Sequence, residues 1–393
     1  MFEPYPVTAY SAINALGTTT RRVIEALSAG RSGLGPCTLD LAFETFAGEL
    51  PEAAPALPAS LGDFDSRTAR IAVAGLDELR PALAASIARH GADRVALVVG
   101  TTTAGLARTE AAYQALQRTG HVPLDYDFHR QHSFGGLLEA VRRAAGVEGP
   151  ALVVSTACSA SAKALASARR LIASGIADAV LVGGVDGLCL TTLYGFHSLE
   201  ILSATACRPF STERNGITIG EGAAYLLLER TGEARAWLLG VGESSDAYHM
   251  AAPHPEGAGA LAAMREALAG SSPSEIDHIN AHSPGTRLND LSEGKAVATL
   301  FGAGGVPIAS TKGYTGHLLG AAGATEAVFS IVALEQGWIP RSLGADPADT
   351  TLGLDVVTER RARPCLRVLS NSFAFGGSNV SLLFGSAPAG GRG

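Results

Sequence analysis

A cysteine at a strand-to-helix junction has the residue type and position for covalent chemistry. Cys158 follows an apolar, valine-rich run at 151–154, which predicts a buried strand. It precedes an alanine-rich helix that runs through Arg170 and ends before Gly175. The thiol then lies beside the unpaired N–H groups of the helix start, where the helix dipole favours an anion. This position favours the thiolate, which is the reactive form, and we expect Cys158 to be a nucleophile rather than a structural thiol.

Three further turns after predicted strands carry residues that can move protons or stabilise charge. His282 lies where a strand gives way to a Pro-Gly loop, Lys312 and His317 lie in a glycine-punctuated loop, and Phe375 lies in a glycine-rich turn. Each residue alone has a plainer interpretation as a hydrogen-bonded histidine, a solvated lysine or a core aromatic. Together with Cys158 they form a nucleophile, acid–base and charge set. The Lys312 loop lacks the residue order of a phosphate loop, so nucleotide binding is discounted.

The segments that must position these residues alternate between strand-like and helix-like patterns. Buried strands are predicted at 95–99, 179–185 and 223–228. The pattern breaks near 231–233 and then restarts. We expect an α/β fold of two halves: residues 1–233 carry the nucleophile, and residues 234–393 carry both histidines, the lysine and the glycine-rich turn. No low-complexity linker separates the halves, so they should pack as one body.

Composition excludes several classes of protein. The 393 residues are 47% hydrophobic with a net charge of −7, which allows a large core and gives no reason to expect nucleic-acid binding. Five cysteines without zinc or thioredoxin spacing predict reduced thiols in a cytoplasmic protein. The first residues lack the pattern of a secretory leader, and no uncharged apolar stretch reaches the roughly 18–20 residues of a membrane span. No metal, nucleotide or flavin is implied.

The reactive turns match an ordered set of motifs. These are Thr156-Ala157-Cys158-Ser159, Ala281-His282 with Gly285-Thr286, Lys312 through His317, and Asn371 through Gly377, with supporting segments at 208–223 and 244–250. In these motifs the chain resembles the elongating β-ketoacyl-acyl-carrier-protein synthases, which are Cys-His-His condensing enzymes of the thiolase superfamily. The likeness covers nearly the whole chain, and this many ordered motifs argue against a chance match.

The resemblance implies a fold and a mechanism. The fold is thiolase-like, with two similar halves in a layered helix–sheet–helix–sheet–helix arrangement. An acyl group passes from a carrier-protein thioester to Cys158, and decarboxylation of malonyl-carrier protein then supplies a carbanion that attacks it. Neutral His282 and His317 would stabilise the malonyl thioester oxygen. The backbone N–H groups of Cys158 and Phe375 would form the oxyanion hole for the acyl thioester.

The same resemblance implies supporting roles for other residues. Lys312 is expected to tune the electric field and to hold His317 in place, rather than to act as a base. Glu293 corresponds to an acidic residue behind the histidine loops, and a solvated helix carboxylate is the alternative interpretation. The chain itself binds no cofactor, because the carrier protein supplies the phosphopantetheine arm.

Two positions depart from the family pattern. Pro284 stands where the family usually has the first of two threonines, which removes one hydrogen bond to pantetheine and stiffens the loop. Thr286 keeps the second and is expected to bind the phosphopantetheine arm. Ala374 stands where many relatives have glycine between Phe373 and Phe375, the expected gate of the acyl pocket, and should restrict its swing.

The expected partners follow from the resemblance as well. The acyl carrier protein is acidic, so a basic docking patch is expected. Arg67 and Arg70 lie roughly where the family places it, and Arg208 is a further candidate. A surface arginine that is simply solvated is the alternative. A homodimer is expected, and a heterodimer with a related ketosynthase-like subunit remains open.

Particular residues argue against other functions and leave the pathway open. A chain-length-determining partner subunit usually lacks the nucleophile, so Cys158 with both histidines argues against that alternative. A biosynthetic thiolase needs a second cysteine near the closing glycine loop, and synthases that start from acyl-CoA normally carry asparagine in place of His317. Fatty-acid and polyene or polyketide pathways both remain open, because segment 125–132, where relatives line the acyl pocket, is a loose match.

Overall fold

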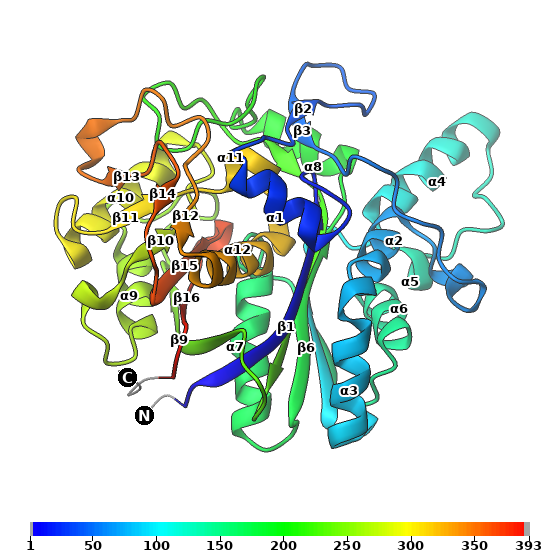
Figure 1. The fold of residues 1–393 in the computed structure, drawn as a ribbon. Coiled ribbons are helices and arrows are strands. Elements are labelled where there is room, and N and C mark those ends of the chain that lie inside the picture. The colour runs from blue at the N-terminus through cyan, green and yellow to red at the C-terminus, as the bar shows by residue number, and fades with distance from the viewer. Residues whose placement is uncertain (1–2, 389–393) are drawn as a thin grey trace.

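An eleven-stranded sheet runs through the whole computed structural model, which describes residues 3–388 (Figure 1). The outermost residues of the two expected halves, 1–2 and 389–393, lie outside this range. In spatial order the strands are β13 (Asp355–Val356), β11 (Pro307–Ala309), β10 (His278–Asn280), β15 (Arg367–Phe373), β16 (Ser378–Gly385), β9 (Ala236–Ser245), β1 (Tyr5–Asn14), β8 (Gly222–Glu229), β6 (Ala179–Asp186), β4 (Val95–Gly100) and β5 (Ala151–Val154).

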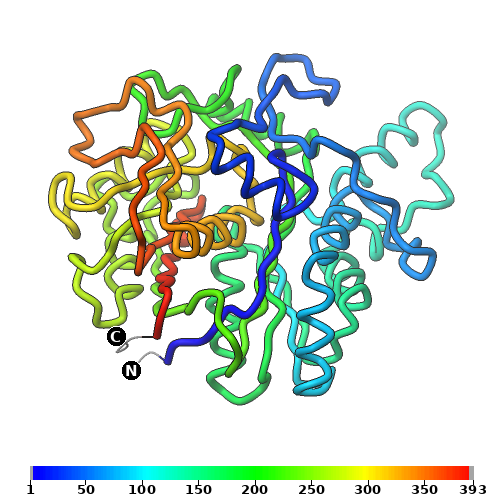
Figure 2. The backbone as a smooth tube through the Cα atoms, viewed as in Figure 1, coloured from blue at the N-terminus to red at the C-terminus, as the bar shows by residue number. Residues whose placement is uncertain are grey.

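The strand order repeats between the two ends of the sheet. On one side β5, β4 and β6 are parallel, β8 is antiparallel to β6, and β1 is antiparallel to β8. On the other side β11, β10 and β15 are parallel, β16 is antiparallel to β15, and β9 is antiparallel to β16. The repeats meet where β1 pairs with β9, and Figure 2 shows the blue-to-green and green-to-red halves side by side. The expected fold of two similar halves is confirmed.

The helices form three layers that alternate with the two parts of the sheet. Helices α7 (Ala160–Ala173) and α12 (Ala322–Gln336) pack against each other between the sheet halves. The outer face of the first half is covered by α2 (Arg67–Ala74), α3 (Arg80–His90) and α6 (Phe134–Ala145). The outer face of the second half is covered by α9 (Ala258–Ala267) and α10 (Arg287–Phe301). Three separate apolar clusters fill the spaces between these layers, as the expected layered fold requires.

Small residues let the two central helices approach each other and the sheet. Helix α12 is buried from 322 to 334, and its sequence is apolar on every face apart from a few polar residues, as is typical of a core helix. A Cβ atom on Gly323 would lie 2.7 Å from the backbone nitrogen of Ala162 in α7. A Cβ atom on Gly100 would lie 2.4 Å from the nitrogen of Ser161. These contacts place the start of α7, and with it Cys158, at the centre of the molecule.

Further elements surround the central layers. The helices are α1 (Thr20–Ser28), α4 (Leu106–Thr119), α5 (Phe128–Gln131), α8 (Leu190–Ser198) and α11 (Lys312–Thr315). One small sheet contains β2 (Gly35–Pro36), β3 (Phe46–Gly48) and β7 (Ile219–Gly220), and another contains β12 (Trp338–Ile339) and β14 (Arg361–Ala362). Across residues 3–388, the helices are too short or too polar for any of them to cross a lipid bilayer.

Candidate active site

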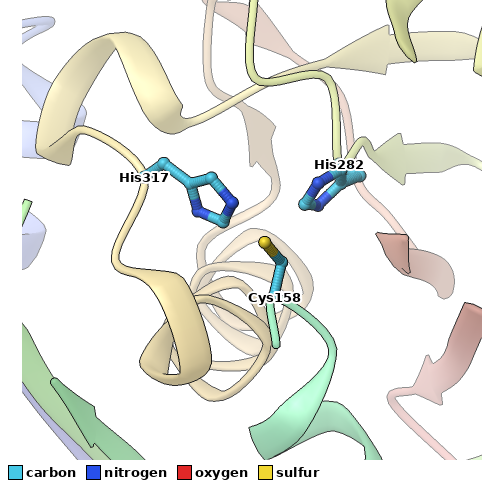
Figure 3. A group of neighbouring side chains, drawn as sticks. All are labelled: Cys158, His282 and His317. Atoms are coloured by element: carbon cyan, nitrogen blue, oxygen red, sulfur yellow. The ribbon is translucent and has the colours of Figure 1, made fainter. Parts of the chain in front are cut away.

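Cys158 lies in the turn between β5 and α7, as the sequence predicts. The preceding residue, Ala157, has a φ of 50°, a left-handed conformation that costs a residue with a side chain roughly 1–2 kcal/mol. The turn is closed by two backbone hydrogen bonds, from Ser159 to Thr156 (3.3 Å) and from Ala160 to Ala157 (3.0 Å). This sharp turn directs the sulfur atom toward two imidazole rings (Figure 3).

Two histidines from the second half face the sulfur of Cys158. His282 follows β10, and His317 follows the short helix α11. One ligand atom from each of the three side chains lies within 4.8 Å of the others, and the imidazole centroids are 5.2 Å apart. All three residues are at least nine-tenths buried. The arrangement therefore needs both halves of the chain, because the nucleophile comes from one and the imidazoles from the other.

The surroundings of Cys158 oppose the thiolate form that its position at a helix start favours. Burial raises the pKa of the thiol to about 11, and the charge of Lys312 and the backbone N–H groups of Phe375 and Cys158 itself oppose this rise only in part. The helix start favours the thiolate, but the cost of holding a bare anion in a buried site outweighs that effect. Near neutral pH the nucleophile is a thiol that needs a neighbouring base.

Both histidines are neutral near pH 7. Burial holds the pKa of each imidazole well below 6.5, and the positive charge of Lys312 lowers it further. Nδ1 of His282 and both ring nitrogens of His317 are buried and have no hydrogen-bond partner among the described residues. A neutral imidazole offers one N–H donor and one lone pair, so each ring is free to donate to an oxygen or to accept a proton. These states agree with the neutral imidazoles that the resemblance implied.

Lys312 forms a buried ion pair that the sequence analysis did not identify. Its Nζ contacts Oε1 of Glu326 in α12 and donates to the backbone carbonyl of His282. Burial raises the pKa of Glu326 to about 7, against the opposing effect of the lysine. The expectation that Lys312 holds His317 in place is not met by these contacts, which fix the His282 loop instead. The available signal was a single carboxylate within the apolar stretch 322–334.

Glu293 holds the first histidine loop from behind. One carboxylate oxygen accepts the N–H of His282 (3.0 Å) and the side-chain amide of Asn371 (3.1 Å), and the other accepts the N–H of Ser283 (2.7 Å). The side chain is buried, and burial raises its pKa. The alternative of a solvated helix carboxylate is therefore wrong. Glu293, which belongs to helix α10, therefore connects the His282 loop to strand β15 through Asn371.

Asp186 at the end of β6 is a second buried carboxylate that the sequence analysis missed. One oxygen accepts the backbone N–H groups of Thr102 (2.9 Å) and Thr103 (2.7 Å), and the other accepts the N–H of Gly320 (2.6 Å). It thereby joins the loop after β4 to the segment that follows His317. The signal in the sequence was an aspartate ending a fully apolar strand.

A pocket of about 400 Å³ opens from the three reactive side chains to the surface. Its wall includes Phe373 and Phe375, the expected gate, together with Thr286, the expected pantetheine residue, and Pro284. The structure therefore brings these four sequence-predicted positions into the same space as Cys158.

The glycine-rich turn presents a backbone donor to this pocket. The N–H of Phe375 points at the sulfur of Cys158. The next two residues, Gly376 and Gly377, have φ values of 80° and 76°, which favour glycine. Their own N–H groups donate to the carbonyls of Met250 (2.8 Å) and Ala374 (3.0 Å). The turn is thus fixed by its flanking bonds while the N–H of Phe375 faces the reactive centre.

The three expected docking arginines lie outside this pocket. Each is engaged in an ion pair: Arg67 with the buried Glu221, Arg70 with Asp65, and Arg208 with Glu213. Arg67 and Arg70 line a separate surface depression near the start of α2. They are partly exposed, and they are not free charges.

The comparisons with known proteins all point to one family. The family model "Beta-ketoacyl synthase, N-terminal domain" matches residues 3–234, and the C-terminal domain model matches residues 235–346. The curated 3-oxoacyl-[acyl-carrier-protein] synthase 2 of Coxiella burnetii is 33% identical over 403 residues, covering 96% of this chain and 97% of that protein. The protein of the same name from Synechocystis is 32% identical over 409 residues, with 96% and 97% covered.

Solved structures give the same result. A chain from the complex of the ketosynthase ApeO with its chain length factor ApeC, from Xenorhabdus doucetiae, superposes with a TM-score of 0.92 at 39% identity, covering 98% of this chain and 100% of that one. A chain of the ishigamide ketosynthase/chain length factor superposes with a TM-score of 0.90 at 30% identity, with the same coverage.

Proposed function

Because the chain belongs to the β-ketoacyl synthase family, we propose that it condenses an acyl group with malonyl-carrier protein to give a β-ketoacyl thioester, in fatty-acid or polyketide and polyene synthesis. The family resemblance inferred from the motifs is confirmed. The observation that carries the proposal is the convergence of Cys158, His282 and His317 within one pocket. A thiol beside two neutral imidazoles supplies a nucleophile together with groups that can accept a proton or donate a hydrogen bond.

The first step transfers the acyl group to Cys158. The thiol gives its proton to a neutral imidazole as its sulfur attacks the thioester carbonyl, since the pKa of the thiol is raised to about 11 by burial. The N–H groups of Cys158 and Phe375 hold the resulting oxyanion, a contact typically worth about 3–4 kcal/mol of barrier for each donor. Collapse expels the carrier's thiolate, which takes the proton from the imidazole.

The second step forms the carbon–carbon bond. The malonyl thioester oxygen accepts hydrogen bonds from His282 and His317, and carbon dioxide leaves with its bonding electrons remaining on the enolate. The enolate carbon attacks the acyl-cysteine carbonyl, whose oxyanion again faces the N–H groups of Cys158 and Phe375. Expulsion of the Cys158 thiolate yields the β-ketoacyl product, and a proton from solvent restores the thiol.

An acyl carrier protein would deliver both thioesters on its phosphopantetheine arm. Thr286 lines the pocket next to the His282 loop, where it can hydrogen-bond the arm. Arg67, Arg70 and Arg208 are the proposed docking residues, and their carboxylate partners would have to exchange with acidic groups of the carrier. The curated relatives are named for acyl-carrier-protein substrates, which supports this partner.

A second ketosynthase-like subunit would cover one of the two edges of the large sheet, the edge at β5. Strand β5 ends the sheet, so one side of its backbone has no strand partner among the described residues. Leu152 in the middle of β5 is 43% exposed, and the adjoining helices α5 and α6 expose Phe128 and Phe134. Similar structures include ketosynthase complexes with chain length factors, so the partner is a second copy or a related subunit.

The halves and the location complete the proposal. We assign residues 1–233 to the nucleophile half and residues 234–393 to the half with both histidines, supported by the repeated strand order that restarts at β9. All five cysteines are free thiols, which fits the reducing cytoplasm.

A condensation assay tests the proposed function. Incubation with octanoyl-carrier protein and malonyl-carrier protein should release carbon dioxide and give a β-ketoacyl product, observed by mass spectrometry. The Cys158→Ala variant should form no acyl-enzyme, whereas Cys158→Gln should keep decarboxylation because both histidines remain. Unchanged condensation by Cys158→Ala would contradict the nucleophile assignment. Activity that appears only when a second subunit supplies a cysteine would favour the chain-length-partner alternative.

A further inference from the structure

One arginine stands apart among the residues that line the active-site pocket. Arg287, the first residue of α10, is the only lysine or arginine among the described residues of the pocket wall. It is exposed and forms no ion pair with any residue in the described range 3–388. Most other arginines of this chain are paired with carboxylates. The pocket therefore contains one cation whose charge is not neutralised by the protein.

The carboxylates in the same wall do not neutralise Arg287. Asp246 already accepts from the side-chain amide of Asn379 (2.8 Å) and from the backbone N–H of His254 (3.2 Å). Glu200 lies on the exposed rim and forms no ion pair with Arg287. A guanidinium presents a fork of N–H donors that matches an anion with two oxygens. Arg287 is thus available for an external anion.

The loop that carries Arg287 runs from the floor of the pocket to its rim. His282 at the floor is 2% exposed, and the next three residues are buried as well. Thr286 is half-buried, Arg287 is exposed, and the following Leu288 is 63% exposed. Every residue of the loop from His282 to Leu288 lines the pocket, except Ser283 and Gly285. A long ligand in the pocket therefore meets His282 at its inner end and Arg287 at its outer end.

We propose that Arg287 binds the phosphate group of the phosphopantetheine arm. This inference rests on the proposed function, because the arm is the carrier of both thioesters. Its thioester lies at one end and its phosphate at the other, with two amides between them. The pocket wall offers an imidazole at the floor, a hydroxyl at Thr286 and a guanidinium at the rim, in the same order. Pro284 has no N–H to donate to the arm, so more of the binding of the arm depends on the residues at the rim of the pocket.

The malonyl carboxylate is the competing anion. It is separated from the thioester carbonyl by a single carbon, and that carbonyl must lie against His282 and His317 at the buried floor. Arg287 is five residues along the loop, on the exposed rim, so a carboxylate held there would leave the reacting carbonyl away from the imidazoles. The geometry favours the phosphate.

A pair of substrates that differ only in the phosphate tests the proposal. The probes are octanoyl-phosphopantetheine and octanoyl-pantetheine, and the measured quantity is kcat/KM for acylation of Cys158, followed by intact mass. We expect the wild type to prefer the phosphorylated probe about five- to tenfold, since a charge-assisted contact at an exposed rim is of modest strength. Arg287→Ala should reduce this ratio to about one. Arg287→Lys should keep part of it, because a point charge lacks the planar fork.

The controls separate the two proposals. Arg265 is an exposed arginine of α9 outside the pocket wall, and Arg265→Ala should keep the wild-type ratio. A wild type that uses neither probe nor acyl-carrier protein overturns the proposed function itself. A wild type that uses both probes equally, or an Arg287→Ala variant that keeps the preference, overturns the phosphate assignment alone. If Arg287→Ala keeps the preference for the phosphorylated octanoyl probe but condenses malonyl-pantetheine more slowly than the wild type, Arg287 binds the malonyl carboxylate instead.

Discussion

Burial sets the protonation states of the reactive residues. It raises the pKa of the Cys158 thiol and lowers the pKa of both imidazoles, because in each case the charged form loses its hydration. All three groups are therefore neutral at rest. The thiol has a proton to give and each neutral imidazole has a lone pair to accept it. The acyl-transfer step can therefore move a proton within the pocket without first creating an isolated charge.

Alkylation of Cys158 should follow its raised pKa. Because the thiolate is the reactive form, the rate of modification by iodoacetamide should rise about tenfold for each unit of pH up to about 11. Peptide mapping by mass spectrometry isolates Cys158 from the other thiols. Lys312→Met should slow the reaction at any given pH, because the lysine charge favours the thiolate. A rate that levels off near neutral pH would contradict this resting state.

His278 offers a test of burial away from the reactive centre. Burial lowers its pKa to about 4, so between about pH 4 and 6.5 the unfolded chain binds the proton that the folded chain refuses. Its stabilising contribution is present above pH 6.5 and is lost as pH falls. The advantage of the wild type over His278→Asn in urea unfolding should therefore shrink by about 3 kcal/mol across this window. A difference independent of pH would contradict the lowered pKa.

The Lys312–Glu326 pair should show strong coupling. Glu326→Gln leaves a buried ammonium without its counter-charge, and breaking such a pair typically costs about 3–5 kcal/mol. Lys312→Met removes the other charge, and the double variant Lys312→Met/Glu326→Gln should be less destabilised than the sum of these two single variants. Urea unfolding of the four proteins completes the cycle. Additive effects would show that the two side chains do not interact in solution.

At the scale of elements, the site is positioned by the ends of strands and by glycines that let α7 pack closely against α12 and β4. The carboxyl ends of parallel strands β5 and β10 carry Cys158 and His282 into the space between the sheet halves. The central helices must pass close together for these ends to meet. Buried carboxylates then tie the loops to their neighbours: Glu293 holds the turn after β10, and Asp186 links the loop after β4 to the segment after His317.

Two helical glycines give a matched test of the close contact between helices α7 and α12. A Cβ on Gly323 in α12 would lie 2.7 Å from a backbone atom of α7, so Gly323→Ala should destabilise the fold by about 1–3 kcal/mol. A Cβ on Gly294 in α10 would meet only ordinary contacts at 3.5 Å and beyond, so Gly294→Ala should be neutral or stabilising by up to about 1 kcal/mol. Thermal or urea unfolding measures both. Equal effects would contradict the close crossing.

At the scale of the whole molecule, the free edge of β5 is the place that we propose for a second subunit. A charged side chain on β5 should oppose association, because it would have to lose its hydration when a second strand pairs with β5 and covers the apolar surface. Leu152→Lys should reduce the mass measured by light scattering after size exclusion toward that of one chain. Leu366→Lys, at a more exposed leucine of the other half (66% against 43% for Leu152), is the control and should not change it. A wild type that already elutes as one chain would contradict homodimerisation and favour a different partner subunit.

The sequence determined the local chemistry and the repeat. The valine-rich run before Cys158, the restart of the pattern after 231–233 and the ordered motifs predicted the nucleophile turn, the two halves and the family. Only the tertiary structure decided the charge states and the contacts. Sequence spacing does not reveal that Glu326 faces Lys312, that Asp186 holds Gly320, or that the thiol is too buried to ionise at rest. Each of these depends on which groups from distant segments share a space without water, and that is settled when the two halves close around the site.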